Sequence, residues 1–251
     1  FSTWAGQHAG LYQAYCDLKA SEHFTTLSVA QKKAIDNALR DFELSGIGLP
    51  MEKQKRYGEI SARLSELGST YSNNVLDATM GWSKLITDEN DLKGLPESAL
   101  AAAKALAESK EQEGWLLTLD IPSYLPVITY GENRALREEM YRAFGTRASD
   151  QGPNAGKWDN SEVMAEILSL RHELAQLLGF DSYADMSLAT KMAESPAQVI
   201  DFLSGLATRA RPQGEQELAQ LRAFAKEHFG VDEMEAWDLP FYGEKQKQHL
   251  F

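Results

Sequence analysis

The sequence has 251 residues, of which 43% are hydrophobic and 25% are charged. This composition is typical of a globular chain that can bury a sizeable core, and it excludes an intrinsically disordered protein. The formal charge of −12, from 25 basic and 37 acidic residues, disfavours nucleic acid and anionic membranes as partners. The acidity is typical of a well-hydrated surface, although a mild preference for cationic partners stays open.

The single cysteine, Cys16, excludes an internal disulfide and fits a reducing compartment. It lies in a helical pattern with Leu11, Tyr12 and Tyr15, so we expect it to be packed rather than nucleophilic. No run approaches the ~18 apolar residues that a membrane span requires. The opening residues lack the pattern of a signal peptide, and neither end of the chain carries a clear terminating signal. We therefore expect a piece of a larger protein.

Residues 1–80 are predicted to form an N-terminal region of long helices. Ser28 is a candidate N-cap for a helix over 28–45, which carries Ile35, Leu39 and Phe42 at helical spacing. Pro50 then restarts a longer helix, which is typical of a rod in a helical bundle. The apolar stripe of this second helix comprises Tyr57, Ile60, Leu64, Leu67, Tyr71 and Leu76.

Residues 81–132 are predicted to form a small antiparallel sheet and a short helix near 99–107. Pro122 and Pro126 lack a backbone donor, so we expect no more than three strands with exposed edges. The candidate strands are 81–88, Trp115–Asp120 and Tyr124–Tyr130, with Ile121–Ser123 as the break between the last two.

Residues 133–251 return to helical patterns, so the predicted fold class is mainly α and bundle-like. A polar loop interrupts them at 145–159, and the aromatic tail at 237–242 is interpreted as a turn. No repeat of 20–50 residues is present, which argues against a solenoid. The predicted helices are 133–144, 161–178, 182–193, 196–211 and 213–229.

A helical zinc peptidase site requires His-Glu-x-x-His, in which two imidazoles one turn apart bind the metal and the glutamate activates water. The nearest match begins His172-Glu173 but has Gln176 in place of the second histidine. At ~100° per residue, His172 and Gln176 also fall opposite the apolar stripe that contains Leu174. We therefore expect His172 to face solvent or a neighbouring polar surface and predict no metal ligand in this chain.

The remaining patterns do not complete a catalytic group. His8, His23, His228 and His249 are scattered along the sequence, and no Glu-x-x-His pair is present. Neither a phosphate-binding Gly-Lys-Ser/Thr loop nor a Gly-x-Ser-x-Gly elbow occurs. We predict no catalytic residue, and substrate-binding residues stay unassigned.

The polar loop at 147–160 is the segment with the most hydrogen-bonding groups outside the helices. One interpretation is a helix connection capped by Asp159, Asn160 or Ser161. The other is a surface loop that lines a cleft of a larger protein. Both interpretations stay open at this point.

Five runs of the sequence resemble the thimet-oligopeptidase-like zinc metallopeptidase family. The resemblance covers essentially the whole chain in order, which makes it specific. The runs are Arg40–Gly46, Tyr71–Leu76, Asp120–Pro126, Gly152–Asn160 and Ser187–Pro196.

This resemblance implies a cytoplasmic zinc peptidase that degrades short peptides within a deep, narrow channel between two helical halves. It also implies that the zinc ligands, the glutamate base and the groups that stabilise the transition state lie C-terminal to residue 251. The present chain would then form non-catalytic structure and part of the channel wall, with the missing catalytic half as its intramolecular partner. Three interpretations of the chain stay open: part of such a peptidase, a self-contained helical binding or scaffold module, and an enzyme of unrelated chemistry.

Overall fold

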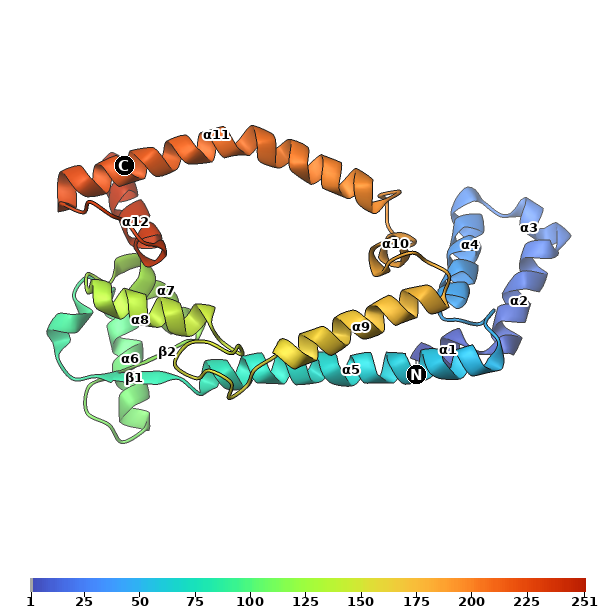
Figure 1. The fold of residues 1–251 in the computed structure, drawn as a ribbon, viewed down its shortest axis with the longest axis horizontal. Helices are drawn as coiled ribbons and strands as arrows, with labels where there is room; N and C mark the ends of the chain where they lie inside the picture. The colour runs from blue at the N-terminus through green and yellow to red at the C-terminus, as the bar shows by residue number, and fades with distance from the viewer. Residues whose placement is uncertain (1) are drawn as a thin grey trace. The chain divides into compact units, whose positions relative to one another are not determined.

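The computed structural model describes residues 2–251, and its regular structure is almost entirely helical (Figure 1), which confirms the mainly α prediction. The chain forms two compact units: unit 1 comprises Phe1–Thr70 and Val163–Val199, and unit 2 comprises Tyr71–Glu162 and Ile200–Phe251. The division into regions 1–80, 81–132 and 133–251 stays a prediction. No helix within residues 2–251 is both long enough and apolar enough to cross a membrane.

In unit 1, the N-terminal helices pack through aromatic contacts around Phe42. Ser28 caps α4 in a capping box with Gln31, and Phe42 of this helix contacts the rings of Tyr12 and Tyr15 from α2. The predicted helix at 28–45 is therefore confirmed. The elements are α1 (Ser2–Gly6), α2 (Ala9–Ala20), α3 (Glu22–Thr26), α4 (Val29–Leu44), α5 (Met51–Met80), α9 (Ser161–Leu177) and α10 (Tyr183–Leu188).

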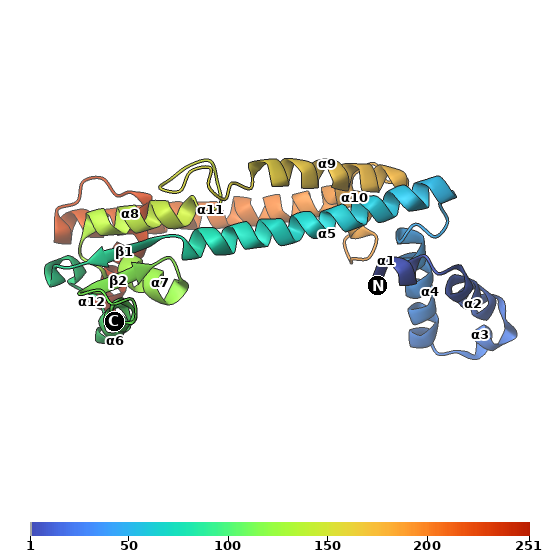
Figure 2. The same cartoon turned by 90° about the horizontal axis from the view of Figure 1, so that it is seen from below.

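Helices α5 and α9 lie antiparallel along their unit 1 portions, side by side in both views (Figures 1 and 2). The Arg63 guanidinium pairs with Glu166 at 2.6 Å, and seven residues earlier Arg56 pairs with Glu173 at 2.6 Å. These ion pairs are about half exposed, so each contributes little free energy. Ile60 of α5 is fully buried, so apolar burial supplies more of the stability of this region.

Unit 2 is built around a two-stranded antiparallel sheet in which Ser83 pairs with Thr118 and Ile86 with Trp115. The strands at 81–88 and 115–120 are thus confirmed in position. The elements are β1 (Ser83–Ile86), η1 (Glu89–Leu92), α6 (Glu97–Ser109), β2 (Trp115–Thr118), α7 (Ile121–Tyr130), α8 (Arg134–Gly145), α11 (Pro196–Phe229), η2 (Ala236–Asp238) and α12 (Leu239–Leu250).

The predicted third strand at Tyr124–Tyr130 is wrong, because this segment is helix α7. Asp120 is its N-cap residue, and Pro122 lies in the first turn, where a missing N–H costs nothing. Tyr124, Val127 and Ile128 are buried at helical spacing. Burial of this face overrides the strand preference of the β-branched and aromatic residues.

Three further predictions are wrong in their boundaries. The segments 196–211 and 213–229 form a single helix, α11, that continues through Pro212. The tail at 237–242 begins α12, since Pro240 also occupies a first helical turn. Helix α10 ends at Leu188 rather than near residue 193.

The main core of unit 2 lies between the sheet and helices α6, α7 and α8. Tyr124 stacks on Phe144 with ring centroids 4.1 Å apart, and Met140 of α8 is fully buried. The buried members are Trp82, Ile86, Leu92, Leu95, Ala103, Leu117, Leu119, Tyr124, Val127, Ile128, Leu136, Met140 and Ala143.

Met140 provides a direct test of this core. We expect Met140→Ala to lower the free energy of unfolding of unit 2 by about 2–5 kcal/mol, because it leaves a cavity. Urea unfolding followed by tryptophan fluorescence measures the change, since four of the five tryptophans lie in unit 2. Met80→Ala is the matched control within the same unit, since Met80 is 71% exposed and its truncation should matter by less than about 0.5 kcal/mol. Equal effects of the two variants would contradict the assigned core.

Candidate functional site

The residues that come nearest to a zinc motif lie on α9, and two of the three have structural partners outside this helix. His172 is exposed, as expected from its position opposite Leu174. The carboxylate of Glu173 accepts two hydrogen bonds from Arg56, at 2.6 and 2.7 Å. The side-chain amide of Gln176 donates to the backbone oxygens of Phe180 and Asp181, which satisfies carbonyls beyond the end of α9.

The other histidines have local contacts, and two of them lie side by side although they are scattered in the sequence. The Nδ1 atom of His8 accepts a hydrogen bond from the N–H of Leu11 and so caps α2. His228 of α11 and His249 of α12 lie together, with ring centroids 4.7 Å apart, although they are far apart in sequence. Across residues 2–251, no group of three or more His, Cys, Asp or Glu residues is placed to hold a metal ion.

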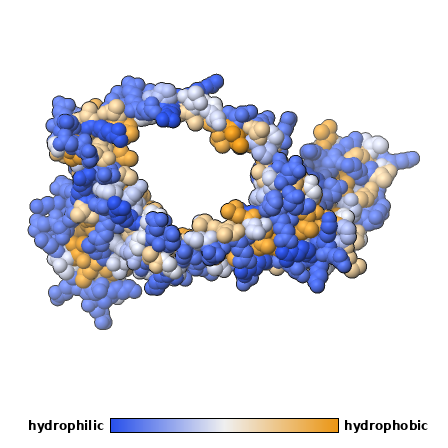
Figure 3. All heavy atoms as spheres, viewed as in Figure 1, coloured by the Kyte–Doolittle hydropathy of each residue, from blue (hydrophilic) through white to orange (hydrophobic). Residues whose placement is uncertain are grey.

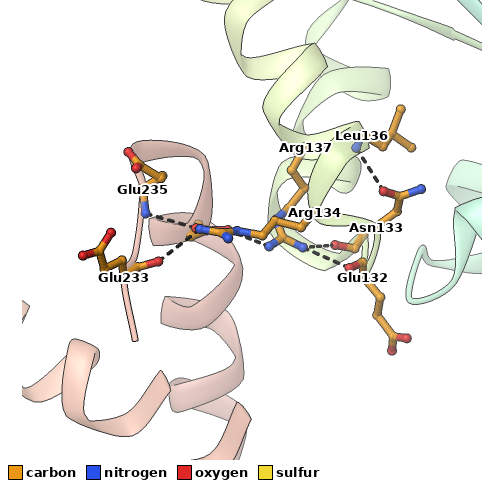
Figure 4. A network of polar contacts seen from close by, with 9 residues as sticks. Glu132, Asn133, Arg134, Leu136, Arg137, Glu233 and Glu235 are labelled. Carbon is orange, nitrogen blue, oxygen red and sulfur yellow. Dashed lines mark hydrogen bonds and ion pairs between the residues drawn. The ribbon is translucent and has the colours of Figure 1, made fainter. Parts of the chain in front are cut away.

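The most deeply buried polar cluster of unit 2 joins α8 to the start of α12 (Figure 4). Asp238 is fully buried, and Arg137 is 1% exposed. The Nη2 atom of Arg137 donates to Asp238 at 2.8 Å, and Arg134 donates to the same carboxylate through Nη2 at 2.7 Å. The N–H of Glu235 adds a third donor at 3.0 Å. Two cations and one backbone amide therefore surround a single carboxylate.

This arrangement fixes the charge state of Asp238. Burial alone would raise the pKa of its carboxyl group, because it disfavours the charged form. The hydrogen bonds from Arg134 and Arg137 and from the N–H of Glu235 outweigh burial and hold the pKa below its ordinary value. The same contact raises the pKa of Arg134. Asp238 is therefore an ionised structural group rather than a proton donor at neutral pH.

Arg137 extends the cluster to the aromatic residues of α12. Its guanidinium carbon lies 4.1 Å from the ring centroid of Phe241, a cation–π contact. Its Nη1 atom donates to the backbone oxygen of Gly131 at 2.8 Å. All of these interactions hold elements together, so we interpret the cluster as a clamp between α7, α8 and α12. Local sequence patterns carry no signal for this clamp, because Arg137 and Asp238 are 101 positions apart.

The polar loop between α8 and α9 is fastened to the end of α5 within unit 2. Asn160 is 1% exposed, donates to the backbone oxygen of Tyr71 and accepts from Asn74 at 2.8 Å. Asp159 accepts from the N–H of Ser161, the first residue of α9, and so satisfies one free amide at the start of this helix. Arg147 donates to the hydroxyl of Thr79 at 2.7 Å. These contacts favour the interpretation as an ordered helix connection.

A pocket of about 330 Å³ lies between α6, β2 and the start of α7. Apolar side chains form most of its wall, including Leu95, Leu106 and Leu116. Its polar groups are engaged locally, since the hydroxyl of Ser123 accepts from the N–H of Thr118. The pocket therefore offers apolar contacts and no paired acid and base.

Comparison with known proteins gives the class of this chain. Residues 127–251 match peptidase family M3, and residues 1–54 match the N-terminal domain of neurolysin and thimet oligopeptidase. The M3 match begins within α7 and contains both Arg137 and Asp238 of the clamp. The chain belongs to this peptide-hydrolysing family.

Within the family, the chain is similar to oligopeptidase A. It is 76% identical to oligopeptidase A of Salmonella typhimurium and 68% identical to that of Haemophilus influenzae, in each case over all 251 residues. Dipeptidyl carboxypeptidase of Escherichia coli is 27% identical over 84% of the chain and is matched over 30% of its own length. The chain spans 37% of the length of the two oligopeptidases.

Asp238→Asn tests the clamp. We expect it to lower the free energy of unfolding of unit 2 by about 3–5 kcal/mol at pH 7, because two arginines lose their counter-ion and one of them is buried. Asp232→Asn is the control, since Asp232 pairs with Lys226 at the surface and its loss should cost no more than about 1 kcal/mol.

The effect of Asp238→Asn on the free energy of unfolding should also depend on pH. The depressed pKa of Asp238 stabilises the fold above the unfolded-state value of about 4, and this contribution is lost as pH falls through the folded-state pKa. Unfolding measured between pH 7 and pH 3 should therefore show the wild type approaching the stability of Asp238→Asn on acidification. A constant difference across that range would contradict the assignment.

Proposed function

We propose that this chain is the N-terminal part of a cytoplasmic, zinc-dependent oligopeptidase that hydrolyses short peptides. Its own residues form non-catalytic structure and part of the wall of the substrate channel. The observation that supports this proposal is the 76% identity to oligopeptidase A along the entire chain, which nevertheless spans only 37% of that enzyme. The catalytic part, with the zinc ligands and the glutamate base, would then follow residue 251.

The donors within this chain do not fit the zinc site of such a peptidase. The candidate Glu173 is paired with Arg56, and Gln176 is hydrogen-bonded to backbone oxygens at the end of α9. An amide in this position supplies no imidazole nitrogen for the metal. We therefore assign no step of peptide hydrolysis to these residues.

A self-contained helical binding module is the second candidate. Its support is a row of exposed apolar residues on α11, which includes Ile200 and Leu203. Exposed apolar surface of this kind marks interaction sites in many proteins. The sequence of the gene beyond the codon for Phe251 separates the candidates: a His-Glu-x-x-His motif in the same frame supports the peptidase, and a stop codon supports the module.

Peptide hydrolysis tests the proposal at the level of activity. We expect the longer gene product to cleave a fluorogenic short peptide, to lose this activity with a chelator and to regain it with Zn²⁺. The 251-residue chain alone should show neither cleavage nor stoichiometric zinc. His172→Ala in the longer protein is the control, and kcat/KM should stay within about twofold because this side chain is exposed. Zinc-dependent cleavage by the 251-residue chain would overturn the proposal.

A further inference from the structure

One face of α11 is apolar along almost its whole length within unit 2. At ~100° per residue, ten apolar and small residues of this helix fall within a sector about 120° wide. Glu217 lies near the edge of this sector, and the exposed Phe202 lies outside it. The helix continues through Pro212 without losing this face, because Pro212 itself lies on another side. The residues of the sector are Ile200, Leu203, Leu206, Ala207, Ala210, Gly214, Leu218, Leu221, Phe224 and Ala225.

The C-terminal end of this face is already covered. Ala225 is fully buried in a cluster with Phe241 and Tyr242 of α12, and Leu221 packs against the same cluster. Leu218 is also partly buried. These residues are spaced by three and four positions, so α12 covers the apolar sector and leaves the rest of the helix exposed.

The N-terminal end of the same face is open. Ile200 is 62% exposed, Leu203 is 55% exposed and Leu206 is 49% exposed. Every residue from 200 to 217 is exposed. Figure 3 shows the corresponding apolar spheres gathered over the N-terminal half of α11.

This open stretch is poorly suited to remain an isolated helix. Gly205 and Gly214 are less favourable than alanine in a helix interior, and Pro212 is less favourable still. Helices in proteins gain most of their stability from packing of an apolar face rather than from propensity. Residues 200–214 therefore need a partner that covers Ile200, Leu203 and Leu206.

We propose that the open face of α11 is the docking surface for the polypeptide that follows residue 251 in the longer protein. The inference rests on the proposed function. The chain spans 37% of the length of its oligopeptidase A relatives, so most of such a protein lies outside these 251 residues. The open face is also continuous with the part that α12 covers. Ala207, Ala210 and Gly214 are small, so another helix can approach closely at this surface.

Paired charge variants test this docking surface. Leu203→Glu with Leu206→Glu places two carboxylates on the open face, and Thr208→Glu with Ala219→Glu places two on the opposite side as a matched control. We expect the face variant to lower the Tm of the longer protein by about 5 °C or more and the control variant to leave it nearly unchanged. In the 251-residue chain, both variants should leave the Tm nearly unchanged, because both sets of side chains are exposed there.

Two outcomes would overturn the inference. The first is a face variant that leaves the Tm of the longer protein unchanged. The second is a 251-residue chain that self-associates by light scattering and loses this association in the face variant, which would assign the surface to a second copy. Peptide cleavage by the wild-type longer protein is measured separately, so failure of the docking surface is distinguishable from failure of the proposed function.

Discussion

The buried carboxylate of Asp238 determines how the C-terminal part of unit 2 packs. An isolated ionised carboxylate in the interior would be very costly, so this position depends on both Arg134 and Arg137. Those arginines belong to α8, which is itself anchored in the main core through Met140. Asp238 thereby places the first turn of α12, and Phe241 follows three positions later against the guanidinium of Arg137.

The position of α12 in turn determines which part of α11 is covered. Phe241 and Tyr242 bury Ala225 and shield Leu221, so the C-terminal turns of α11 become part of a second apolar cluster. The turns from Ile200 to Gly214 carry the same apolar face without any cover. The ion pairs of Asp238 therefore place α12, and the packing of α12 determines which part of the apolar face of α11 is covered.

The elements with strong local signals could be predicted from the sequence. Ser28 marks the start of α4, Pro50 marks the start of α5, and Asn133 marks the start of α8. Helix α7 and the start of α12 could not be predicted in this way. Their Pro122 and Pro240 were interpreted as breaks, whereas each lies in a first helical turn.

Contacts between residues far apart in the sequence could not be predicted from local patterns either. The exposure of His172 followed from helical periodicity, and the structure confirms it. The clamp of Arg137 with Asp238 and the pairing of His228 with His249 depend on tertiary packing, so periodicity carried no signal for them. The resemblance to a peptidase family rested on runs of sequence, and it holds along the whole chain.

The identity to oligopeptidase A and the architecture favour a structural contribution by these residues to a larger peptidase. Cover of its apolar face, rather than helix propensity, stabilises α11 where another element packs on it. Hydrogen–deuterium exchange along α11 in the 251-residue chain tests this claim most directly. We expect slow amide exchange at 218–229, where α12 packs, and fast exchange at 200–214. Uniform protection along the whole helix would contradict the claim.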